Sequence, residues 1–224
     1  MIFRDLNLEK NLIENLESLG YKTLTPIQEN SLKYSLEKKD IIARAKTGSG
    51  KTLAFCLPII NNLDKKKYRV QSLILAPTRE LATQIAQTIR EVLRSTQNIK
   101  VLTLCGGVPY RPQVVSLSHE AHIVVGTAGR VLKHINEGNL KLENINTFVL
   151  DEADKMLDMG FFDDISNVCS LLPKQRQTLL FSATFSNEIK NLALEFLNNP
   201  VNIEVEDEEQ NIIKQVFYEV NSRD

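Results

Sequence analysis

The chain has 224 residues, of which 42% are hydrophobic and 25% are charged, and its formal net charge is −1. This length and composition are typical of a water-soluble globular protein with one sizeable α/β domain. The near-zero charge excludes a basic field over the whole surface. Any binding of nucleic acid must therefore come from a local basic patch or from oriented backbone and helix dipoles.

The N-terminal part is predicted to form two helices. Apolar residues repeat at helical spacing over residues 7–19, and Gly20 is placed to end that helix. The second helix has a predicted capping box, in which Thr25 is the N-cap, Pro26 is the first helical residue and Gln28 is the third. On this pattern alone, capping is the favoured role of Gln28.

A glycine-rich loop at residues 45–52 is the strongest motif in the chain. It follows an apolar strand pattern and opens an apolar helical pattern, which is the context that a phosphate-binding loop requires. In such a loop, backbone N–H groups cradle phosphate oxygens, Lys51 reaches the β- and γ-phosphates, and the Thr52 hydroxyl binds Mg²⁺. Ala45 departs from the consensus G-x-x-x-x-G-K-[ST] because it stands at the first glycine position. The alternative is an ordinary strand-to-helix turn. The loop residues are Ala45, Lys46, Thr47, Gly48, Ser49, Gly50, Lys51 and Thr52.

From residue 40 onward, strand and helix patterns alternate along the chain. Helical patterns such as those at residues 80–93 and 188–197 separate most of the strands. The alternation predicts a doubly wound, mainly parallel sheet with helices on both faces and with ligands at the carboxyl ends of the strands. Strands are predicted at residues 40–44, 72–76, 100–104, 122–125, 147–150, 178–182 and 201–204.

We expect a single domain over residues 1–205. An acidic run follows it, and residues 206–224 are predicted to be a linker. A basic run at residues 65–69 is interpreted as a solvated loop, with RNA contact as the alternative.

The cysteines and the hydropathy of the sequence indicate in which cellular compartment the protein is found. Three cysteines lie far apart in apolar surroundings, which favours buried free thiols in a reducing compartment. There is no run of about 18 apolar residues, and the N-terminus lacks the apolar region of a signal peptide. We therefore expect a cytoplasmic protein without a membrane partner, with a nuclear location as the alternative. The cysteines are Cys56, Cys105 and Cys169.

An acidic cluster follows the predicted strand at residues 147–150. A carboxylate at this position beside a phosphate loop is well placed to hold Mg²⁺, which is the role predicted for Asp151. Its neighbour Glu152 can accept a proton from an attacking water. The alternative is an acidic first turn of the next helix, which the helix dipole favours. The presence of the phosphate loop makes the catalytic interpretation the stronger one.

These motifs resemble those of the DEAD-box RNA helicases, and the details are similar to bacterial members of the DbpA type. The resemblance covers residues 3–205 and implies a RecA-like P-loop NTPase domain that uses ATP and Mg²⁺. The tetrapeptide Asp151-Glu152-Ala153-Asp154 gives that family its name. The other matching segments are Phe3, Gly20-Tyr21, Thr25-Pro26-Ile27-Gln28, Ala45 to Thr52, Pro77-Thr78-Arg79-Glu80-Leu81-Ala82, Gly106-Gly107, Thr127-Ala128-Gly129-Arg130 and Ser182-Ala183-Thr184.

The resemblance also implies roles for single residues. Gln28 would read the adenine edge, and Tyr21 would stack on adenine, with packing against the first helix as the alternative for Tyr21. A hydrogen-bonded link between the nucleotide and the RNA surface would be formed by Asp154, Ser182 and Thr184. The alternative is ordinary helix capping, since Thr184 and Ser186 both precede the predicted helix at residues 188–197.

The implied RNA contacts suit phosphates rather than bases. Thr78 and Thr127 are predicted N-caps that place backbone N–H groups and a helix dipole at a loop end. We therefore expect sequence-independent binding of RNA, with a surface salt bridge as the alternative for Arg130. Leu24 and Ala128 stand where the family usually has proline, which loosens both loops. The predicted RNA-binding residues are Pro77, Thr78, Arg79, Gly106, Gly107, Thr127, Gly129 and Arg130.

The family also needs a second RecA-like domain, whose arginines contact the γ-phosphate. No segment after residue 205 matches it, so we expect the amino-terminal half of an ATP-dependent RNA helicase, with RNA and the second domain as partners. We expect this half by itself to be monomeric. Such a helicase couples ATP hydrolysis to local unwinding. The alternative is an ATP-gated RNA clamp or scaffold. Without the second domain, the chain should bind nucleotide weakly and have negligible RNA-stimulated ATPase activity.

Overall fold

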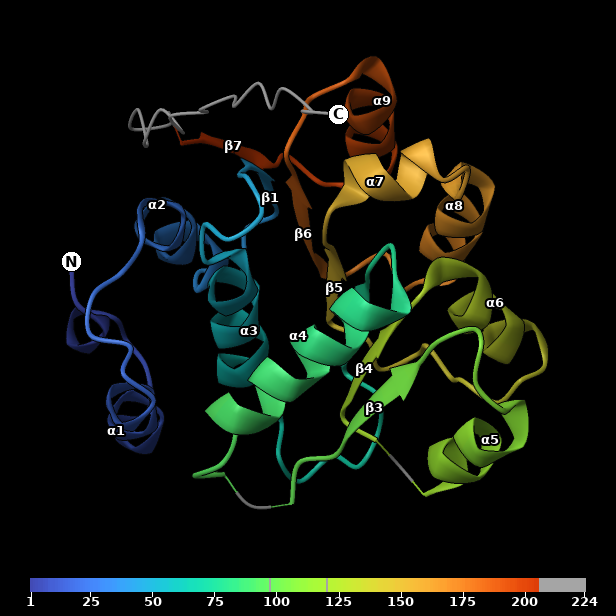
Figure 1. Ribbon diagram of the computed structural model, residues 1–224, viewed down its shortest axis with the longest axis horizontal. Coiled ribbons are helices and arrows are strands. Elements are labelled where there is room, and N and C mark those ends of the chain that lie inside the picture. The colour runs from blue at the N-terminus through green and yellow to red at the C-terminus, as the bar shows by residue number, and fades with distance from the viewer. Residues whose placement is uncertain (97, 120, 206–224) are drawn as a thin grey trace, which may run out of the picture.

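The computed structural model describes residues 1–96, 98–119 and 121–205, and the predicted linker at 206–224 lies outside them (Figure 1). The described strands form one seven-stranded sheet in the order β3-β4-β2-β5-β6-β1-β7. Every pairing in this sheet is parallel, so the predicted doubly wound α/β architecture is confirmed. The strands are β1 (Ile41–Arg44), β2 (Ser72–Leu75), β3 (Val101–Leu104), β4 (Ile123–Gly126), β5 (Thr147–Leu150), β6 (Gln177–Ser182) and β7 (Val201–Glu204).

Both faces of the sheet are covered by helices, as Figure 1 shows. Helices α1 to α4 contribute to one hydrophobic cluster and α6 to α9 to the other. Side chains alternate between the two clusters along β2, because Ile74 joins the first cluster while Leu73 and Leu75 join the second. The helices are α1 (Lys10–Ser18), α2 (Pro26–Ser35), α3 (Lys51–Asn61), α4 (Arg79–Val92), α5 (Tyr110–Ser118), α6 (Ala128–Asn136), α7 (Ala153–Asp158), α8 (Phe162–Leu171) and α9 (Asn187–Phe196), and a short 3₁₀ helix, η1, covers Phe3–Asp5.

The predicted end of the first helix and the predicted start of the second are confirmed, but the predicted start of the first is wrong. The helices expected at residues 80–93 and 188–197 each lie one residue earlier, as α4 and α9. Helix α1 ends in a Schellman motif, in which Gly20 has a φ of 88° and the Tyr21 N–H donates to the Leu16 carbonyl at 3.0 Å. The same helix begins at Lys10 rather than at residue 7. Its predicted first residues instead form a turn that packs Leu6 and Leu8 against the first hydrophobic cluster.

The three cysteines are free and buried, as predicted. Burial raises the pKa of the Cys169 thiol to about 12, which makes it unreactive at neutral pH. Across the described ranges, no helix combines the length and the apolar character needed to cross a membrane.

Candidate functional site

The predicted site residues converge on one edge of the sheet. Because all strands are parallel, the loops that follow them share the carboxyl edge. The phosphate loop, the acidic cluster and the predicted coupling residues follow β1, β5 and β6, which are adjacent, whereas Tyr21 and Gln28 precede β1. The predicted RNA residues follow β2, β3 and β4, which are also adjacent. The sheet order therefore divides this edge into two neighbouring halves.

The glycine-rich loop leaves β1 without breaking the sheet. The Ala45 N–H donates to the Ser182 carbonyl at 2.9 Å, so the residue at the variant position still pairs with β6. Its methyl group is buried, which explains why alanine fits here in place of glycine. Gly48 and Gly50 have φ values of 83° and 94°, and α3 begins at Lys51. The predicted strand–loop–helix context is thus present.

Gln28 holds this loop in place. Its Nε2 donates to the Gly50 carbonyl at 3.0 Å, and its Oε1 accepts from the Thr25 N–H at 3.0 Å. A Cβ on Gly50 would lie 2.6 Å from Gln28 Nε2, so only glycine allows this approach. The predicted capping bond from the Thr25 N–H is confirmed. The same amide also reaches the phosphate loop.

Lys51 and Asp151 form a buried pair at the base of the loop. Lys51 Nζ lies 3.9 Å from Asp151 Oδ1, and the two residues are 6% and 2% exposed. Neither atom has a hydrogen-bond partner among the described residues. Desolvation raises the pKa of Asp151 to about 6, against the pull of the Lys51 ammonium. Because Lys51 Nζ and Asp151 Oδ1 have no hydrogen-bond partner, the buried ion pair fits phosphate oxygens on the lysine and a hard cation on the aspartate.

The donor set also suits Mg²⁺ rather than a cation that needs several protein ligands. In the described part of the chain, no group of three or more His, Cys, Asp or Glu side chains could hold a metal ion. Mg²⁺ usually takes one or two carboxylates and completes its shell with water and substrate phosphates. Asp151, with the Thr52 hydroxyl at the start of α3, supplies a set of that kind.

Glu152 is fixed from two sides. The Thr47 hydroxyl donates to its Oε1 and the Lys155 ammonium to its Oε2, both at 2.8 Å. Burial opposes the charge of Glu152, but these two hydrogen bonds outweigh it and lower the pKa of this carboxyl group. Its φ of 52° directs the chain into α7 immediately after β5. Glu152 is therefore an ionised, oriented acceptor beside the phosphate loop.

Asp154 links the acidic cluster to the end of β6. Its Oδ2 accepts from the backbone N–H groups of Ala183 and Thr184, both at 3.1 Å, and from the Thr184 hydroxyl at 3.4 Å. Ser182 joins this group, because its Oγ accepts from the Thr184 N–H at 3.4 Å. The structure therefore brings together the three residues that were predicted to couple the two halves of the site. It does not place them as the caps of α9, whose N-cap is Ser186.

The two predicted threonine caps differ. Thr78 Oγ1 accepts from the Leu81 N–H at 3.2 Å and caps α4, as predicted. Thr127 occupies the N-cap position of α6, but its side chain makes no capping bond. The loop after β3 lies close to the start of α4, since a Cβ on Gly107 would be 3.5 Å from Arg79 Nη1.

The sequence allowed two roles for each of Arg130 and Tyr21, and the structure shows which protein groups they contact. Arg130 Nη1 donates to the Val108 carbonyl at 3.2 Å and to Gln113 Oε1 at 3.1 Å, with no ion pair to the described residues. The alternative of a surface salt bridge is therefore wrong. Tyr21 packs against the first hydrophobic cluster, in agreement with the packing alternative. That contact does not test a role in stacking on adenine.

Sequence reasoning missed Gln113, His134 and Gly126. Gln113 and His134 are buried and hydrogen-bonded to each other at 2.9 Å, but no local pattern marks either one. Gly126 ends β4 so close to the next helix that a Cβ would lie 2.6 Å from Val131 Cγ2. A glycine directly before the Thr127 motif was the one available signal.

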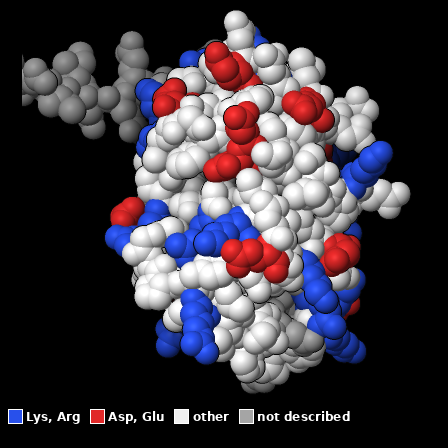
Figure 2. All heavy atoms as spheres, turned by 90° about the vertical axis from the view of Figure 1, so that its right-hand side faces the viewer, with Lys and Arg blue, Asp and Glu red and all other residues white. Residues whose placement is uncertain are grey.

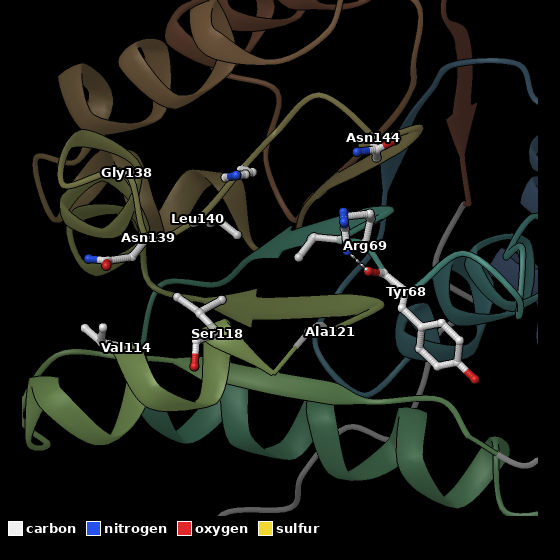
Figure 3. Close-up of a pocket in the computed structure, with 12 residues that line it drawn as sticks. Tyr68, Arg69, Val114, Ser118, Ala121, Gly138, Asn139, Leu140 and Asn144 are labelled. Carbon is white, nitrogen blue, oxygen red and sulfur yellow. Dashed lines mark hydrogen bonds between the residues drawn. The ribbon is translucent and has the colours of Figure 1, made fainter.

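A pocket of about 400 Å³ lies away from this edge, before the strands begin (Figure 3). Its lining includes Val70, Ala121 and Asn144, which precede β2, β4 and β5. The basic run predicted to be a loop borders it through Tyr68 and Arg69 and contains no helix or strand. This position separates both the pocket and the basic run from the phosphate loop.

Surface charge agrees with the near-zero net charge. On the face in Figure 2, Lys and Arg side chains are interspersed with Asp and Glu side chains. This face carries no continuous basic field, so any phosphate binding there depends on local groups.

Known proteins resemble the chain over almost its whole length. A family model described as DEAD/DEAH box helicase matches residues 25–192. The CshA DEAD-box ATP-dependent RNA helicase of Geobacillus kaustophilus is 41% identical over 99% of this chain and 48% of its own length. The ATP-dependent RNA helicase DbpA of Escherichia coli is 46% identical over 94% of this chain and 46% of its own. A solved DEAD box protein from Methanococcus jannaschii superposes with a TM-score of 0.88 at 40% identity, over 92% of this chain and 56% of that one.

Proposed function

Because the chain belongs to the DEAD/DEAH box helicase family, we propose that it is the ATP-binding half of an enzyme that couples ATP hydrolysis to the local opening of RNA duplexes. The observation that carries this proposal is the buried ion pair of Lys51 and Asp151 beneath a loop that Gln28 holds, in which Lys51 Nζ and Asp151 Oδ1 have no hydrogen-bond partner among the described residues. Buried charged groups with unsatisfied hydrogen-bonding atoms are costly, so such a pair is best explained by a ligand that completes it.

The residues have separate tasks in this proposal. The loop N–H groups and Lys51 bind the phosphates, and Gln28 recognises adenine through the amide that now holds Gly50. When bound, Mg²⁺ held by Thr52 and Asp151 supplies charge neutralisation at the phosphate oxygens. Glu152, which the Thr47 hydroxyl orients and whose lowered pKa keeps it ionised, positions the attacking water and accepts its proton.

RNA is proposed to lie along the neighbouring half of the same edge. The capped start of α4 and the glycines at 106 and 107 offer N–H groups and close backbone approach, which suit phosphates. Asp154 connects this half to the nucleotide through the backbone of residues 183 and 184. This arrangement supports sequence-independent binding whose strength depends on the nucleotide.

The chain spans about half the length of the curated relatives that it matches. We propose that the remaining half supplies arginines to the γ-phosphate, a contribution worth about 10³–10⁵ in hydrolysis rate. The test compares the 224-residue chain with the full-length protein that contains it. The chain should bind ATP weakly without RNA-stimulated turnover, whereas the full-length protein should hydrolyse ATP in response to RNA. Robust RNA-stimulated turnover by the chain, or none by the full-length protein, would contradict the proposal.

A further inference from the structure

The glycine pair 106–107 is held from both flanks by side chains outside it. On one flank, Gln113 Nε2 donates to the Cys105 carbonyl at 3.0 Å. On the other, Arg130 Nη1 donates to the Val108 carbonyl at 3.2 Å. A Cβ on Gly106 would meet nothing within 4 Å and one on Gly107 would meet only Arg79 Nη1, at 3.5 Å, so the glycine pair itself stays open to a ligand.

Gln113 joins these two flanks. Its Oε1 accepts from Arg130 Nη1 at 3.1 Å and from His134 Nε2 at 2.9 Å. A rotated amide would turn its NH₂ group toward those two donors and its oxygen toward the Cys105 carbonyl, so only one orientation satisfies every contact. His134 is fully buried and its ring stacks on Tyr110 with the ring centroids 4.3 Å apart, so its Nε2 stays beside the amide oxygen in the orientation that Arg130 and the Cys105 carbonyl select.

We propose that Gln113 is a positioning residue for RNA, because it locks the glycine pair 106–107 and Arg130 into one rigid phosphate-binding unit. This inference rests on the proposed function. Gln113 is only 8% exposed, so it acts through the loop and Arg130 rather than by touching RNA. Preorganised donors bind a phosphate without the entropic cost of ordering the loop, so loosening the unit should weaken RNA binding and leave ATP binding unchanged.

The test uses Gln113→Met in the full-length protein, because methionine keeps the side-chain length and removes the hydrogen bonds. The matched control is Gln71→Met. Gln71 is also buried and makes three hydrogen bonds to residues 64 and 67, but it precedes β2 at the opposite edge of the sheet. Both variants should lower the melting temperature. Only Gln113→Met should raise the RNA concentration for half-maximal ATPase stimulation, by about tenfold, with an unchanged KM for ATP at saturating RNA.

A double variant checks whether Gln113 acts through Arg130. Adding Gln113→Met to Arg130→Met should cost less than the sum of the two single effects on RNA half-saturation. The inference is overturned if Gln113→Met behaves like Gln71→Met, if it raises the KM for ATP equally, or if the two effects add. If the unaltered full-length protein shows no RNA stimulation, the proposed function fails first and this inference fails with it.

Discussion

Thr47 and Glu152, which are 105 residues apart in the sequence, are joined by a hydrogen bond of 2.8 Å from the threonine hydroxyl to Oε1. This bond ties the phosphate loop to the proposed acceptor of the water proton. Lys155 holds the other carboxylate oxygen at 2.8 Å. Both bonds favour the ionised form, so Glu152 is an available base at neutral pH.

Replacing Glu152 with glutamine should separate ATP binding from hydrolysis. Glutamine keeps the shape of the side chain and its bond to Thr47, but its amide cannot take a proton. We expect single-turnover ATP hydrolysis by the full-length protein to fall by about 10²–10⁴-fold, while ATP affinity changes little. Thr47→Val, which removes only the orienting hydroxyl, should have a smaller effect on the rate. An unchanged hydrolysis rate in Glu152→Gln would exclude the assigned role.

Asp151 should make the stability of the ligand-free chain depend on pH. Burial raises its folded-state pKa from 3.8 to about 6, so the fold binds this proton more tightly than the unfolded chain does. Its contribution to stability is therefore complete below about pH 3.8 and is lost as the pH rises through about 6. Asp151→Asn removes this dependence.

Urea unfolding of both proteins at pH 4 and pH 7.5 tests this expectation. The unfolding free energy of the unaltered chain relative to Asp151→Asn should fall by about 2 kcal/mol between the two pH values. Saturating ATP with Mg²⁺ should reduce the fall, because the bound ligand favours ionised Asp151. A free-energy difference that stays constant with pH would show that Asp151 ionises normally in the folded chain.

Local sequence patterns predicted most of the strands and helices and the nucleotide half of the site. The strand at 147–150 was predicted with its observed bounds, because a fully buried strand is an unbroken apolar run between clear turn signals. Gly50 and Lys51 likewise predicted the phosphate loop and the start of the helix that follows it. These features depend on neighbours in the sequence.

The missed features depend on contacts that only the folded sheet creates. Gln113 meets Arg130 and His134 because β3 and β4 place α5 beside α6, and no spacing in the sequence encodes that contact. The double role of Gln28 has the same origin. Its bond to Thr25 follows from helix capping, but its bond to Gly50 requires α2 to pack against α3.

Gly50 should be more sensitive to alanine than a glycine with similar backbone strain. Gly50 and Gly138 have φ values of 94° and 71°, so alanine costs about 1–2 kcal/mol in backbone strain at each. At Gly50 the added Cβ would also lie 2.6 Å from Gln28 Nε2, whereas at Gly138 nothing lies within 4 Å. Gly50→Ala should therefore lose more stability in urea unfolding and should also weaken ATP binding at least about tenfold. Gly138→Ala should keep its ATP affinity, and equal losses of stability in the two variants would show that Gln28 moves aside freely.

The two threonine caps on the RNA half should differ in stability but not in their effect on RNA. Thr78→Ala removes a capping bond of 3.2 Å to the Leu81 N–H and should cost about 1 kcal/mol of unfolding free energy. Thr127→Ala removes no capping bond and should cost only about a few tenths of a kcal/mol. Both variants should weaken RNA binding by the full-length protein, because both loop ends are proposed to face phosphates. Fluorescence anisotropy with a labelled single-stranded RNA measures this binding. Thr83→Ala, on the exposed face of α4, is the control and should leave RNA binding unchanged. If Thr127→Ala destabilises the chain as much as Thr78→Ala does, then Thr127 caps α6 in solution. The two threonines would then not differ in helix capping.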